Sequence, residues 1–139
     1  MPQNKITLLT AATATNSAPS GGSAGVETNG LKVGGNVPDT CTVLVYSSAG
    51  SDTMTATIRM WGYSNSIWLP LGTGASGAAD TKGVLNENVA IAETSADFIA
   101  HAEPLSYCGH FERLYAEVTA IGGTSTAINV VVVCEQILD

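Results

Sequence analysis

The residues best suited to chemistry lie together in one short stretch, residues 107–113 (YCGHFER). In an extended chain Cys108, His110 and Glu112 share one face, because side chains alternate along a strand. Cys, His and Glu are all zinc ligands, and a Cys–His pair is the basis of some nucleophilic sites. Their spacing matches no known ligand pattern, and no third group stands out to orient the pair. We therefore predict a polar edge strand with a partly buried thiol here, without a metal ion or a catalytic residue.

Other sequence motifs of catalysis are missing. The chain has no HExxH zinc motif. Its Gly-rich residues 21–25 (GGSAG) match the letters of GxSxG, but they lack the strand and helix of a nucleophile elbow, and they lack the Lys of a phosphate-binding loop. The carboxylates Asp80, Glu87, Asp97 and Glu103 are too scattered for a calcium loop. We therefore predict that the protein is not an enzyme and has no cofactor.

Three aromatic residues, Trp61, Tyr63 and Trp68, flank a turn at residues 62–66. Aromatic side chains near a turn can stack on a sugar ring or anchor a protein interface. We expect Trp61 and Trp68 to pair across the hairpin, because cross-strand aromatic pairs stabilise sheets. Since large aromatics are mostly buried in proteins, a place in the core or a subunit interface is favoured over a carbohydrate site.

The three cysteines, Cys41, Cys108 and Cys134, lie in or beside apolar segments. An odd number closes no complete set of disulfides, and no CxxC pair is present. We interpret them as free, buried thiols that behave as small hydrophobic side chains. This interpretation predicts folding in a reducing compartment.

The charge pattern argues against several classes of partner. The formal net charge is −7, and 12% of the residues are charged, against about 25% in an average protein. The five basic residues are isolated from one another: Lys5, Lys32, Arg59, Lys82 and Arg113. Nucleic acids and anionic membranes need clustered positive charge, so we predict neither as a partner. A surface poor in charge favours an assembly in which neighbours cover it.

The elements that must position these residues are short strands. Alternating and apolar patterns predict strands at residues 5–10, 31–33, 41–46, 53–60, 67–71, 84–91, 114–120 and 127–137. Residues 92–102 have room for one helical turn, and no long helix is expected there. The final strand is apolar on both faces in its middle, with Val131 and Val133 on the second face, so it is predicted to be central or to lie against a partner subunit.

This pattern predicts an all-β fold, namely an antiparallel β-sandwich that is jelly-roll-like. The length of 139 residues suggests one domain. We divide the chain into an N-terminal strand and flexible arm at residues 1–25, rich in Ala, Thr, Ser and Gly, and a single sandwich domain at residues 26–139. We expect no signal peptide, and the longest apolar run, residues 130–134, is too short to cross a bilayer.

Three parts of the chain resemble small virion proteins of tailed bacteriophages. They are residues 7–15 (TLLTAATAT), residues 56–64 (ATIRMWGYS) with 68–73 (WLPLGT), and residues 111–124 (FERLYAEVTAIGGT). The second part is similar to a hairpin of those proteins, and the third to their closing hairpin. Residues 79–105 fall outside the resemblance.

The resemblance implies a structural role on the phage particle, most like that of a capsid decoration (cement) protein. Proteins of that group are short, β-rich and often trimeric, and they bind the expanded capsid at threefold junctions of the major capsid protein. We therefore expect a homotrimer on the virion surface, made and assembled in the host cytoplasm. Binding only to the expanded lattice stabilises that lattice, and three contacts per trimer add avidity.

The residues expected at the subunit or capsid interface are Thr7, Leu8, Leu9, Trp61, Tyr63, Trp68, Val131 and Val133. The N-terminal arm has the composition to add a strand to the exposed sheet edge of a neighbour. The alternative function is that of a tail- or fibre-associated β-sandwich that binds a host glycan at Trp61, Tyr63 and Trp68.

Overall fold

The computed structural model describes residues 3–20, 31–32, 40–49, 54–71, 89–91, 98–106, 111–123 and 126–135. In these ranges the chain forms strands and no helix. The strands are β1 (Gln3–Ala12), β2 (Leu31–Lys32), β3 (Thr40–Ala49), β4 (Met54–Ser64), β5 (Ile67–Leu71), β6 (Val89–Ile91), β7 (Phe98–Ser106), β8 (Arg113–Gly122) and β9 (Ala127–Glu135). The prediction of an all-β chain is therefore confirmed for the described residues.

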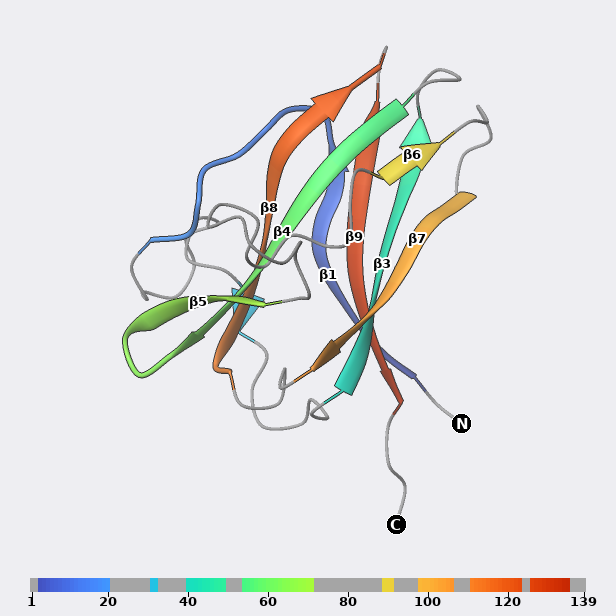
Figure 1. The fold of residues 1–139 in the computed structure, drawn as a ribbon. Helices are drawn as coiled ribbons and strands as arrows, with labels where there is room; N and C mark the ends of the chain where they lie inside the picture. The colour runs from blue at the N-terminus through green and yellow to red at the C-terminus, as the bar shows by residue number, and fades with distance from the viewer. Residues whose placement is uncertain are drawn as a thin grey trace, which may run out of the picture.

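The strands form two antiparallel sheets (Figure 1). The first sheet has the order β1-β9-β3-β7, and the second has the order β2-β8-β4-β5, with β6 also paired to β4. The pairing is nested: β1 pairs with β9, β2 with β8, β3 with β7 and β4 with β6. The short β4–β5 hairpin lies near the middle of this nest. Apart from the β4–β5 hairpin, the paired strands are therefore distant in sequence.

One hydrophobic core joins the two sheets. Alternate residues of each strand enter it, as the period of two predicts. Val43 and Val45 of β3 and Ile58 and Met60 of β4 are all fully buried. Leu9 of β1 belongs to the same cluster, so the N-terminal strand is part of the packed unit.

Strand β1 follows β9 with two register shifts. Ile6 stands opposite Val132, but Leu9, three residues further on, stands opposite Val130. A bulge of this kind inserts an extra residue and bends the strand. Because of this extra residue, the residues of β1 that face the core are not spaced two apart along the whole strand.

The side chain of Asn129 forms hydrogen bonds with backbone groups beside the second register shift, which lies between Leu9 and Ala12. Ala11 has a positive φ of 50°, and its backbone N–H donates to Asn129 Oδ1 at 3.0 Å. Asn129 Nδ2 donates in turn to the carbonyl of Tyr46 on the other side of β9, at 3.4 Å. Asn129 is buried, so these bonds replace water for backbone groups of both neighbouring strands.

Strand β7 corrects the expectation of a helical turn in residues 92–102 for residues 98–102, while residues 92–97 lie outside the described residues. Its nine residues begin at Phe98, and its sequence FIAHAEPLS has weak alternation and contains Pro104. A proline argues against a central strand, but β7 lies at the edge of its sheet, where proline is tolerated. The predicted strands around β3, β4, β5, β8 and β9 are present, with ends that differ by a few residues.

Candidate functional site

The β4–β5 hairpin lies beside β8 in the second sheet. The hairpin turns through Asn65 and Ser66, whose φ angles of 52° and 63° are both positive. Two such residues make the type I′ turn, whose twist matches that of the flanking strands. The turn makes Ser64 and Ile67 the closing pair and fixes the register of the whole hairpin.

Four aromatic residues on the outer face of the second sheet form what we call the aromatic cluster: Trp61, Tyr63, Trp68 and Tyr115. Tyr63 and Trp68 are opposite each other, with ring centroids 5.0 Å apart, and Trp68 meets Tyr115 edge-on at 6.2 Å. Tyr115 is only 5% exposed, whereas the other three are half-buried. Sequence reasoning missed Tyr115, which lies opposite Trp61 on β8.

The predicted pairing of Trp61 with Trp68 is wrong. The two-residue turn places Trp68 opposite Tyr63, and Trp61 opposite Pro70. The prediction assumed a five-residue turn, and the shorter turn brings a different residue opposite each tryptophan. An aromatic pair across the hairpin does form, but it is Tyr63 with Trp68.

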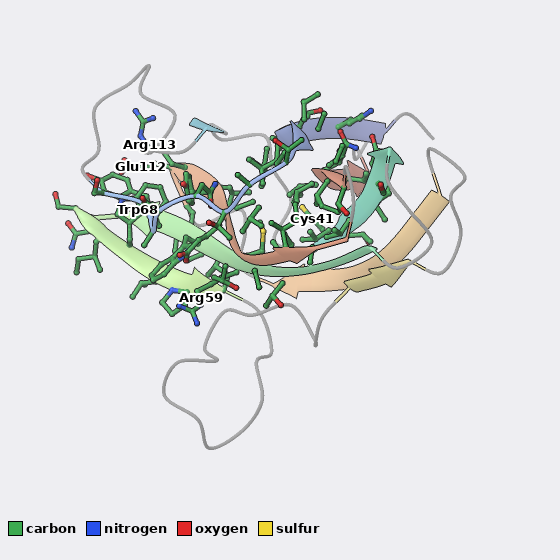
Figure 2. The ribbon with its side chains drawn as sticks, turned by 90° about the horizontal axis from the view of Figure 1, so that it is seen from above. Cys41, Arg59, Trp68, Glu112 and Arg113 are labelled. Atoms are coloured by element: carbon green, nitrogen blue, oxygen red, sulfur yellow. The ribbon has the colours of Figure 1, made fainter. Side chains whose placement is uncertain are left out.

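Polar groups border the aromatic cluster on the side of β8. Trp61 Nε1 donates to Glu117 Oε1 at 3.0 Å. Arg59 stands opposite Glu117, and its Nε is buried without a hydrogen-bond partner among the described residues. In Figure 2, Trp68, Glu112 and Arg113 lie toward one end of the molecule, and Arg59 lies apart from them.

The segment after β1 is fixed to the edge of β8 by Asn16 and Ser17. Asn16 Nδ2 donates to the carbonyl of Ala116 at 3.2 Å, and its Oδ1 accepts from the N–H of Val118 at 2.7 Å. The N–H of Asn16 also donates to the carbonyl of Val118, at 3.3 Å. Asn16 therefore acts like a short piece of neighbouring strand.

The hydroxyl of Tyr115 adds a further anchor, since it donates to the carbonyl of Ser17 at 2.6 Å. Both contacts lie within the N-terminal strand and arm predicted at residues 1–25. Ala11 and Ala12 belong to β1, and Asn16 and Ser17 are bound to β8. Residues 21–25 lie outside the described residues.

The inner face of the hairpin exposes two large apolar side chains, Ile67 (53% exposed) and Leu69 (47% exposed). Both have the orientation of core residues, because Leu69 pairs with the buried Gly62 and the next inward residue, Leu71, is buried. The hairpin projects sideways beyond the first sheet in both views (Figures 1 and 2). These two side chains are therefore exposed because no strand of the first sheet lies opposite them.

The base of the hairpin is closed by the residues that precede β8. A Cβ atom added to Gly62 would lie 2.6 Å from Cγ of Phe111 and 2.9 Å from Cδ1 of Leu71. The N–H of Glu112 donates to the carbonyl of Tyr63 at 2.8 Å. Glycine is therefore required at position 62, because the Phe111 ring occupies the space of a side chain.

The predicted interface residues separate into two groups. Trp61, Tyr63 and Trp68 come together in the aromatic cluster, whereas Thr7, Leu8, Leu9, Val131 and Val133 lie on β1 and β9 of the first sheet. Among the second group, Leu9 is in the core and Val131 is 2% exposed. Neither side chain is accessible to a partner, while Thr7 is exposed and Leu8 and Val133 are half-buried.

The structure changes the interpretation of the cysteines. Cys41 is disulfide-bonded, so the prediction of three free thiols is wrong. Cys108 and His110 lie outside the described residues, and Glu112 is exposed. The described ranges contain no group of three side chains that could hold a metal ion.

The comparisons with known proteins leave the site to be judged on its own chemistry. No protein-family model matches the sequence, and searches of curated proteins and of solved structures return no significant match. In the described part of the chain, no helix has the length and apolar character needed to span a membrane.

Proposed function

We propose that this protein is a decoration protein of a tailed-phage capsid. In this proposal it binds the outer surface of the expanded head as a homotrimer and stabilises the junctions between major capsid subunits. The observation that carries the proposal is the nested strand pairing, taken together with the resemblance of residues 56–64, 68–73 and 111–124 to phage virion proteins.

The nested pairing favours a jelly-roll β-sandwich. Rolling up one long antiparallel hairpin pairs the first strand with the last, the second with the one before the last, and so on inward. The pairs β1·β9, β2·β8, β3·β7 and β4·β6 follow that scheme. Jelly rolls consist of two Greek keys and occur in viral capsid proteins and in lectins. Such a fold is compatible with assembly and with sugar binding.

The β4–β5 hairpin favours assembly over sugar binding. Residues 60–79 contain no charged side chain, although the chain as a whole carries a net charge of −7. Ile67 and Leu69 are the only exposed large hydrophobic residues in the described ranges. An uncharged projection with exposed apolar side chains suits burial against another protein. Three such projections on one trimer would bind with the avidity that a cement protein needs.

The direct test is to mix purified protein with expanded, protein-free phage heads, sediment the heads and count the bound copies. Saturation at hundreds of copies per head, in a multiple of three, is the expected result. Unexpanded heads serve as the control and should bind far fewer copies, because linkage requires preference for the expanded state. Binding of no copies, or of a few copies per head, would disprove decoration.

The second candidate function is that of a glycan-binding module, and the aromatic cluster favours it. The rings of Trp61, Tyr63 and Trp68 are half-buried, and Glu117 and Arg59 provide polar groups beside them. Stacking on aromatic faces with nearby hydrogen-bonding groups is suitable for a sugar ring. Trp68→Ala should then abolish binding to a glycan array while the circular dichroism spectrum remains that of the folded protein. Unfolding of this variant would assign Trp68 to stability instead.

A further inference from the structure

The disulfide of Cys41 has a partner that the backbone register can identify. Cys41 is 2% exposed and lies on the core face of β3, in line with Val43 and Val45. The chain contains two other cysteines, Cys108 and Cys134, so one of them closes the bond. The question is which of the two the fold brings to Cys41.

The register between β3 and β9 favours Cys134. Val43 stands opposite Val132, and Thr42 stands opposite Val133, so the next pair along the two strands is Cys41 with Cys134. Opposed residues of antiparallel strands have Cα atoms about 4.5–5.5 Å apart. A disulfide needs a Cα separation of about 4.4–6.8 Å. The register therefore provides the required separation without any movement of the backbone.

The register between β3 and β7 disfavours Cys108. Leu105 of β7 stands opposite Cys41, and Cys108 follows three residues later in the sequence. No residue of β7 that pairs with β3 is a cysteine, and Cys108 lies outside the described residues.

We propose that Cys41 and Cys134 form the disulfide, and that Cys108 is the free thiol of the protein. The bond joins β3 to β9, the two inner strands of the first sheet. It forms when the two thiols exchange with a small-molecule disulfide such as oxidised glutathione: the S–S bond of the reagent breaks, the protein S–S bond forms, and two reagent thiols are released. The bond closes a long loop from β3 to β9 and restricts the unfolded chain accordingly.

Peptide mapping of the unmodified protein tests the pairing directly. Trypsin cleaves after Lys and Arg, and the five basic residues place the cysteines in three different peptides: residues 33–59, 83–113 and 114–139. The protein is denatured in an alkylating reagent before digestion, so that free thiols are capped and cannot exchange. The expected product is residues 33–59 linked to 114–139, with residues 83–113 alkylated. A link between residues 33–59 and 83–113 would overturn the proposal, and so would full alkylation of all three peptides.

Two matched variants provide an independent measurement. Cys134→Ser should lower the melting temperature Tm of the oxidised protein by about 10 °C, the scale of one native disulfide in a domain of this size. Cys108→Ser should leave Tm unchanged and should still show one disulfide by thiol counting. Reductant should lower Tm of the wild type and of Cys108→Ser, but not of Cys134→Ser. The opposite assignment of these effects to the two variants would contradict the pairing.

Discussion

Ile58 of β4 and Ile67 of β5 share a sheet face but have different surroundings. Both belong to the second sheet, and both point to the side on which the first sheet lies. Ile58 is fully buried between the sheets, whereas Ile67 lies on the projecting hairpin and is 53% exposed. Strand alternation therefore determines which way a side chain points, and the presence of the opposite sheet determines whether that side chain is buried.

Truncation of the two isoleucines should give the largest difference. Ile58→Ala should lower the free energy of unfolding by about 3 kcal/mol, because it removes buried methyl groups and leaves a cavity. Ile67→Ala should change it by less than about 0.5 kcal/mol, because the side chain is exposed. Urea unfolding followed by tryptophan fluorescence measures both values. Equal losses in the two variants would mean that Ile67 is buried in solution by another copy of the chain.

Gly62 marks the boundary between the packed part of β4 and the projecting hairpin. Gly62→Ala should lower the free energy of unfolding by about 2 kcal/mol, because the new methyl group would overlap the ring of Phe111. The double variant Gly62→Ala with Phe111→Ala should lose less than the sum of the two single losses, because the ring no longer competes for the space. Strict additivity in this double-mutant cycle would contradict the overlap.

Two asparagines that bond to backbone groups differ in burial, since Asn129 is buried and Asn16 is half-buried. Asn129→Ala should lower the free energy of unfolding by about 2 kcal/mol, because the amide of Ala11 loses its acceptor beside a buried site. Asn16→Ala, the matched comparison at the edge of β8, should cost about 1 kcal/mol, because the Asn16 side chain is half-buried and its bonds replace water only in part. Hydrogen exchange should accelerate at Ala11 in the first variant and at Val118 in the second. If exchange in both variants accelerated equally at all protected amides, the loss of stability would be global, and the two asparagines would have no local role at Ala11 and Val118.

The sequence was sufficient for those parts of the fold that depend on local pattern. The alternation along β4 and the turn residues Asn65 and Ser66 predict the hairpin. The Val-rich run predicts β9. Strand β7 was missed, because Pro104 and the small residues around it give no clear period. The partner and register of each strand could not be predicted, because they are set by contacts between residues far apart in sequence.

The candidate site was predictable only in part, for related reasons. Three of its four aromatic residues stood out because they flank a turn, whereas Tyr115 looked like any residue of an alternating strand. Its role depends on the register between β4 and β8. Asn16 and Asn129 were not predicted, because their hydrogen bonds depend on two features of the folded sheets. These are the edge of β8 for Asn16 and the register shift of β1 for Asn129. The disulfide of Cys41 was missed because the number of cysteines is odd and their separation in sequence is large.

The smallest predicted effect concerns the turn that holds the hairpin in its register. Ser66 has a φ of 63°, and glycine adopts such angles without the steric cost borne by other residues. Ser66→Gly should therefore raise the free energy of unfolding by about 0.5 kcal/mol, the relief of strain being partly offset by the greater freedom of glycine in the unfolded chain. Ser64→Gly is the matched control and should lower it, because Ser64 lies in a regular strand. Near-ultraviolet circular dichroism should remain unchanged in Ser66→Gly, because Trp68 stays opposite Tyr63. A loss of stability in Ser66→Gly would mean that the turn is not of type I′, and the register of the aromatic cluster would then have to be revised.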